Sequence, residues 1–167
     1  MKKTLVVILL SISIMSTLIM PLFAYDAETQ SSQSIVNTST EYILLDDGGY
    51  IKIELVVSDS PQTRASTFTK TGSKFVTNYD SDDNIIWQYT LTGSFLVESG
   101  VSATCTDSTY STVSNSISWT FSNCSATKSG NEAFGVGTVK RKTLLLFVVE
   151  TVDIDISIKC DVNGQLS

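Results

Sequence analysis

After residue 41 the chain alternates apolar and polar residues over long stretches, and this two-residue period predicts β-strands. Residues 50–57 form one such run, and residues 87–95 form a second in which Trp, Tyr, Leu, Gly and Phe share one face. Residues 117–121 and 152–160 repeat the pattern, most regularly in the last run. Each run is expected to form a strand that buries one face.

Residues 144–149 differ because they are apolar at every position. Such a run predicts a central strand buried on both faces, whereas the same run left exposed would be an aggregation hazard.

Turn-forming residues separate these runs and leave few signals for helices. Their spacing predicts roughly seven to nine strands, and each one-sided strand needs an apolar partner layer. We therefore expect an all-β fold, an antiparallel β-sandwich, with a small barrel as the alternative. The predicted turns are Asp46-Asp47-Gly48-Gly49, Ser60-Pro61, Asp80 to Asn84, Ser99-Gly100 and Ser129-Gly130-Asn131.

The first residues are typical of a secretory signal peptide. Lys2 and Lys3 precede an apolar run, and Pro21 stands shortly before a cleavage site at Ala24. Residues 1–24 are predicted to be removed, with an uncleaved membrane anchor as the alternative. Residues 25–40 are predicted to be a flexible polar leader, and 41–167 a single domain. The mature protein is expected to be extracellular or associated with the cell envelope, without stable membrane insertion.

Composition excludes several classes of function. The 167 residues include no histidine, which rules out a Ser-His-Asp triad, a Cys-His dyad and histidine-ligated metal sites. Loss of residues 1–24 removes two lysines and changes the formal charge from −6 to −8. An acidic protein disfavours nucleic acid as a partner. The one basic run, 140–142, is expected to divide between the two faces of a strand.

Three cysteines allow one disulfide in an exported protein. Cys160 lies on the apolar face of its predicted strand, and Cys105 continues the face of the residues before it. Cys124 is out of phase with its neighbours and is expected in a turn. This favours a Cys105–Cys160 disulfide over Cys105–Cys124, leaving Cys124 unpaired. A loop of that length contributes about 4 kcal/mol in the chain-entropy model.

The order Cys105, Trp119, Cys160 is similar to that of immunoglobulin domains. The tyrosine that usually stands two residues before the second cysteine is replaced by Ile158. The expectation is thus an Ig-like sandwich in general architecture, without homology to that family.

Several segments between residue 70 and the end resemble small secreted proteins of Gram-positive bacteria, mostly Clostridia and their relatives, that carry a domain of unknown function. The resemblance implies a secreted all-β module in which the first and last cysteines pair, but no activity. It is carried by residues 70–74 (KTGSK), 87–95 (WQYTLTGSF), 100–105, Trp119, 128–133 (KSGNEA) and 160–167 (CDVNGQLS).

Two acidic patterns could carry chemistry. Asp80, Asp82 and Asn84 have the spacing that begins a calcium loop, but the required glycine and glutamate are absent, so an acidic turn is the better interpretation. Glu98 and Glu150, near the ends of apolar strands, are the candidates for a glycosidase pair, although solvated positions are favoured. Neither a metal site nor a cofactor is expected.

Aromatic side chains offer a route to ligand binding. Trp87 and Trp119 fall on apolar faces and are expected in the core. Tyr50 lies opposite the apolar face of its strand, and Tyr79 and Tyr110 lie near turns, so these three are the predicted ligand contacts.

The sequence therefore predicts a secreted, non-enzymatic β-sandwich module that binds a glycan or protein at the envelope or outside the cell. The alternatives are a small carboxylate-dependent glycan hydrolase and a secreted inhibitor or toxin-like effector.

Overall fold

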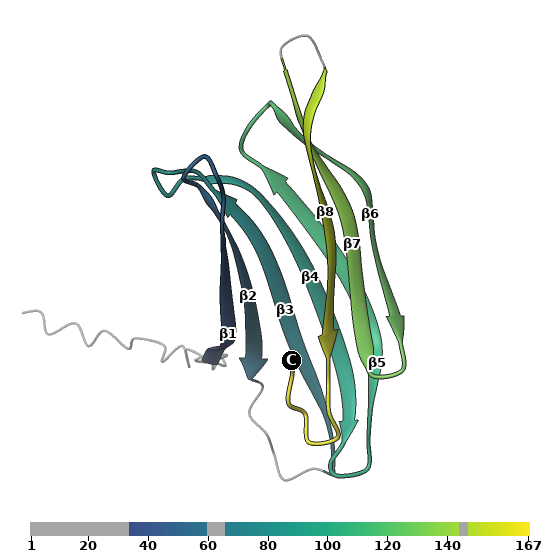
Figure 1. Cartoon of the computed structure of the whole chain (residues 1–167). Coiled ribbons are helices and arrows are strands. Elements are labelled where there is room, and N and C mark those ends of the chain that lie inside the picture. The colour runs from purple at the N-terminus through teal and green to yellow at the C-terminus, as the bar shows by residue number, and fades with distance from the viewer. Residues whose placement is uncertain (1–33, 60–65, 144–146) are drawn as a thin grey trace, which may run out of the picture. The chain divides into compact units, whose positions relative to one another are not determined.

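The computed structural model describes residues 34–59, 66–143 and 147–167. It contains a five-stranded sheet in the order β1-β2-β3-β4-β5 and a three-stranded sheet in the order β6-β7-β8 (Figure 1). All neighbouring strands are antiparallel. The strands are β1 (Ser34–Leu44), β2 (Tyr50–Asp59), β3 (Thr67–Tyr79), β4 (Ile85–Glu98), β5 (Ser102–Ser114), β6 (Trp119–Ser129), β7 (Glu132–Lys142) and β8 (Val148–Lys159).

These two layers confirm the predicted antiparallel sandwich, with eight strands in the described residues. The chain passes from one sheet to the other between β5 and β6, and the described strands form no ladder across the two sheets, unlike a barrel. Within each sheet the strands follow chain order, which differs from the Greek-key order of immunoglobulin domains. Within residues 34–59, 66–143 and 147–167, no helix is long and apolar enough to cross a membrane.

The core lies between the two sheets, on the faces that the alternation identified. Trp87, Tyr89 and Phe95 of β4 are fully buried, and Trp119 of β6 is 8% exposed. Ile154 and Ile158 of β8 face them from the smaller sheet. The core positions predicted for both tryptophans are confirmed.

Two glycines of β7 make room for the ring of Tyr89. A Cβ atom on Gly135 would lie 2.8 Å from the Tyr89 hydroxyl, and one on Gly137 would lie 3.3 Å from the ring. The hydroxyl donates to the carbonyls of Ser125 in β6 and Val136 in β7, at 3.1 and 3.2 Å. Burial raises the pKa of Tyr89 to about 12, so the hydroxyl remains a donor at neutral pH. One side chain of the larger sheet therefore joins two strands of the smaller one.

The C-terminal residues fold back beside β8. Cys160 and Leu166 form an isolated antiparallel bridge, and the Lys159 and Ser167 backbones exchange two hydrogen bonds of 3.0 Å. This places Leu166 against Gly72 of β3, where a side chain on the glycine would collide with it. The tail thus extends the apolar cover of the larger sheet.

Two predicted boundaries are wrong. β1 begins at Ser34, so residues 34–40 belong to a strand rather than to a polar leader. Ile117, assigned to a strand with Trp119, lies in the loop before β6 and is 96% exposed. The predicted signal peptide and the rest of the leader lie outside the described residues.

The buried central strand predicted for residues 144–149 is not formed at the positions that the structure describes. Phe147, Val148 and Val149 are 67, 50 and 55% exposed. Phe147 precedes β8, and Val148 and Val149 are its first two residues. Residues 144–146 lie outside the described part.

Cys124 was expected in a turn but lies within β6. The β6–β7 register shifts between Ser122 and Ser125, and Asn123 adopts a positive φ of 53°. This bulge reverses the alternation, so Cys124 points toward the core, 3.0 Å from where a Cβ of Gly137 would be.

The predicted turns at residues 46–49, 80–84, 99–100 and 129–131 all connect antiparallel strands. Gly48, Gly100 and Gly130 have positive φ values, which explains glycine at these turns. The turn predicted at Ser60-Pro61 lies outside the described residues.

Replacing Gly135 by alanine should lower the free energy of unfolding by about 1 to 3 kcal/mol, because the added methyl group overpacks the site against Tyr89. Urea denaturation monitored by tryptophan fluorescence would measure the change. Val136→Ala, on the exposed face of the same strand, is the matched control and should change stability much less. Equal effects of the two substitutions would contradict this account of the packing.

Candidate ligand-binding face

The structure brings two of the three predicted contact tyrosines together. Tyr50 of β2 pairs with Tyr79 of β3 on the face of the larger sheet that points away from the core. Their rings stack with centroids 4.7 Å apart and planes 15° apart. Tyr42 of β1 extends the row, with its ring 5.8 Å from that of Tyr50 and tilted by 54°. We call Tyr42, Tyr50 and Tyr79 the tyrosine row.

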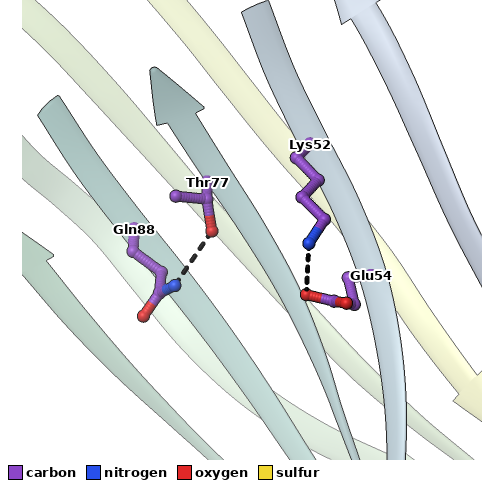
Figure 2. Close-up of polar contacts among 4 residues, drawn as sticks. All are labelled: Lys52, Glu54, Thr77 and Gln88. Carbon is purple, nitrogen blue, oxygen red and sulfur yellow. Dashed lines mark hydrogen bonds and ion pairs between the residues drawn. The ribbon is translucent and has the colours of Figure 1, made fainter. Parts of the chain in front are cut away.

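Polar side chains continue this outer face below the tyrosine row. Lys52 Nζ and Glu54 Oε2 form an ion pair of 2.9 Å, with both side chains about three-quarters buried. Across the next two strands, Gln88 Nε2 donates to Thr77 Oγ1 at 2.9 Å. Figure 2 shows the two pairs on neighbouring strands of the same sheet. The hydrogen bond that the Lys52 ammonium donates to the Glu54 carboxylate raises the pKa of Lys52, so the ammonium group remains charged at neutral pH.

The β3–β4 turn supplies a carboxylate at the edge of the row. The Tyr50 hydroxyl donates to Asp83 Oδ1 at 3.0 Å, and partial desolvation together with this bond raises the pKa of Tyr50. The turn is held by Asp80, whose Oδ1 accepts the backbone N–H groups of Asp82 and Asn84, both at 2.9 Å. These bonds, mainly those from Asn84, lower the pKa of Asp80. The predicted acidic turn is confirmed.

The geometry of the tyrosine row determines what it can contact. Side chains of adjacent strands project side by side, so stacked rings on the sheet turn their edges and hydroxyls outward rather than their faces. Tyr42 belongs to the edge strand, is tilted from its neighbour and is 59% exposed. Its ring can offer a face to a ligand, while the other two rings offer hydroxyls.

Tyr110, the third predicted contact, lies elsewhere. It belongs to β5 on the core side, where its ring stacks on that of Tyr89 with centroids 5.9 Å apart. With Ser108, Thr109 and Ala126 it lines a hollow of about 290 Å³ at the open side between the sheets. Tyr110 therefore does not share a surface with Tyr50 and Tyr79.

The two glutamates considered for catalysis do not converge. Glu150, at the start of β8, forms an ion pair of 2.9 Å with Arg141. Glu98 is exposed at the end of β4, and the nearby Gly100 N–H donates to Val162 O, beyond the other end of β8. A strand of this length separates the two carboxylates by about 30 Å. The described residues contain no group of three or more acidic or cysteine side chains that could hold a metal ion.

The basic run divides between two faces of β7, as predicted. Arg141 points to the core side, pairs with Glu150 and lies 5.8 Å from the centroid of the Trp119 ring. Lys140 and Lys142 alternate with it and point outward.

All three cysteines are free thiols in the structure, so the predicted Cys105–Cys160 disulfide is not formed there. The two residues are nevertheless neighbours: Cys105 N–H donates to Gly130 O and Cys160 N–H donates to Asn131 O, two consecutive positions of one turn. Burial raises the pKa of the Cys160 thiol to about 11, and the nearby Cys105 adds a smaller increase. The pairing stays a prediction.

Two residues of interest were not identified from the sequence. Tyr42 could have been found by folding the chain back about the turn at 46–49, which places it near Tyr50. Lys74 of β3 donates to Ser157 O of β8 at 2.6 Å and joins the two sheets, and burial lowers the pKa of its ammonium group. The sequence pattern does not indicate that Lys74 lies on the core face or that it contacts the other sheet.

Comparison with known proteins adds no relative: the chain matches no known protein family, no curated protein and no solved structure.

Under oxidising conditions the folded protein should form a Cys105–Cys160 disulfide, because both cysteines are buried and their backbone N–H groups bond consecutive positions of the same β6–β7 turn. Peptide mapping without reduction would identify the linkage. Cys160→Ser should abolish it, whereas Cys124→Ser should leave it intact. Recovery of Cys105 joined to Cys124 instead would refute the assignment.

Proposed function

We propose that the mature chain is a secreted, non-enzymatic β-sandwich module that binds a glycan at the cell envelope through the outer face of β1, β2 and β3. The observation that carries this proposal is the tyrosine row with an adjacent set of hydrogen-bonding side chains. Aromatic faces pack against the C–H groups of sugar rings, and polar groups beside them bond the sugar hydroxyls.

Each component has a role in this interaction. The exposed ring of Tyr42 would stack on a pyranose ring. The Tyr50 hydroxyl and the Asp83 carboxylate, already joined at 3.0 Å, would bond its hydroxyl groups. Lys52 and Glu54 would extend the contact to the next sugar along the sheet.

The charges of this face favour a neutral glycan. Two carboxylates, of Glu54 and Asp83, accompany the one ammonium group of Lys52 in this set. An anionic polymer such as a teichoic acid would meet repulsion, whereas a neutral or N-acetylated oligosaccharide would not.

The separation of Glu98 from Glu150, and the pairing of Glu150 with Arg141, supports binding rather than hydrolysis. We also propose that the chain belongs with the small secreted Gram-positive proteins that it resembles.

Residues 25–167 should bind neutral oligosaccharides on a glycan array and sediment with purified Gram-positive cell walls. Tyr42→Ala should weaken binding roughly tenfold, because a single aromatic contact is worth about 1 kcal/mol or more. Tyr50→Phe should weaken it less, since the ring remains and only the hydroxyl is lost. Isothermal titration with the best array ligand would give both values.

Tyr110→Ala is the matched control, since it removes a half-exposed tyrosine from a different surface. Thermal melting of each variant would verify that the fold is intact. Binding by wild type that is unchanged in Tyr42→Ala, or the absence of wild-type binding to every array glycan and cell wall, would sink the proposal.

A further inference from the structure

In Figure 1 the β7–β8 hairpin extends past the end of β6. The described residues of this extension include exposed apolar side chains. β6 begins at Trp119, which pairs with Arg141, so no described strand flanks the hairpin beyond Lys142. Phe147, Val148 and Val149 occupy this end and are each at least half exposed. Large apolar side chains gathered at a protruding end indicate a contact surface.

A fourth apolar residue lies beside the base of the hairpin. The Lys142 N–H donates to Ser118 O at 2.8 Å, which holds the β5–β6 loop against β7. Ile117, the residue before Ser118, is almost fully exposed. We call Ile117, Phe147, Val148 and Val149 the apolar tip.

Contacts at the base of the hairpin hold β7 and β8 in position. The Arg141–Glu150 ion pair joins β7 to β8, and Arg141 also lies over the Trp119 ring. The Thr143 N–H donates to Phe147 O at 2.9 Å. These contacts fix the hairpin without using the side chains of the apolar tip, which therefore remain exposed.

Two lysines lie directly behind the apolar tip. Lys140 and Lys142 point to the outer face of β7, and neither forms an ion pair within the described part of the chain. The turn aspartates belong to the β1–β2 and β3–β4 hairpins of the other sheet. On the same outer face, Asp153 of β8 pairs with Thr138 and accepts a hydrogen bond from its hydroxyl at 2.9 Å. Beyond Asp153, toward the end of the hairpin, the outer face presents the two lysines first and the apolar side chains after them.

We propose that the apolar tip inserts into the interface of a phospholipid bilayer, with Lys140 and Lys142 contacting lipid phosphates. The order of apolar end and cationic base matches the order of acyl chains and phosphates in a bilayer. Lysine side chains are long enough to reach the phosphates while apolar neighbours lie deeper. The contact is shallow and reversible, and it uses a surface distinct from the tyrosine row.

Sedimentation with vesicles tests this directly, using residues 25–167, which contain both sheets. Vesicles of phosphatidylcholine with an equal amount of phosphatidylglycerol should bind the protein, and those of phosphatidylcholine alone should bind it less. Phe147→Ser with Val149→Ser should reduce partitioning roughly tenfold or more, through the lost apolar burial. Lys140→Gln with Lys142→Gln should abolish the preference for the anionic vesicles.

Leu96→Ser is the matched control, because it removes an apolar side chain of similar exposure far along the chain from the hairpin; it should bind vesicles as wild type does. The proposal is overturned if wild type sediments with neither vesicle, or if the Phe147 and Val149 variant binds equally well. It is also overturned if wild type forms dimers in sedimentation velocity that this variant lacks, since the tip would then join two copies. The vesicles carry no sugar, so failure here leaves glycan binding untouched.

Discussion

The contact between Tyr89 and the glycines of β7 sets how the two sheets meet. A fully buried tyrosine needs a partner for its hydroxyl, and here it donates to carbonyls of both β6 and β7. The ring can approach those carbonyls only because Gly135 and Gly137 have no side chains. The bulge at Asn123 belongs to the same arrangement, since it turns Cys124 toward Gly137 beneath the ring. This contact determines how closely β4 approaches β7, and it holds the Tyr89 ring between the two sheets.

The smaller sheet covers only some of the strands of the larger sheet. β3, β4 and β5 lie opposite the three strands of the smaller sheet, while β1 and β2 extend past it. Leu166 of the folded-back tail packs at β3, and the Lys74 ammonium bonds the β8 backbone at the boundary. The hairpin β1–β2 therefore depends on β3 for its position. Its outer face carries Tyr42 and Tyr50, so the candidate binding face is built on strands whose support comes from one side only.

Alternation predicted β2, β4, most of β6 and β8, and the core positions of both tryptophans, because burial of one face imposes a two-residue period. The spacing of the turns between such runs then predicted the two-layer architecture. Alternation failed where a single residue broke that period. Asn123 at positive φ moved Cys124 from a predicted turn into the core, and no residue pattern near it signals the bulge. Ile117 was assigned to the same strand as Trp119 because both fall on the apolar side of the alternation. Alternation does not indicate the residue at which strand pairing begins or ends. Tyr50 and Tyr79 were identified singly; their stacking depended on a β2–β3 register that lies across a long connection.

The position of Lys140 and Lys142 distinguishes a ligand role from a protective one. Lysines often protect the edge of a sheet against pairing with another chain, but β7 is the central strand of its sheet, with β6 and β8 on either side. Edge protection therefore does not account for them. Nor do they form ion pairs with the nearby carboxylates of the described strands: Glu150 is paired with Arg141 on the opposite face, and Asp153, on their own face, accepts a hydrogen bond from Thr138. Lys140 and Lys142 are therefore free to bind an external anion. The exposed apolar side chains next to them favour an anion at the surface of an apolar phase, such as a lipid phosphate.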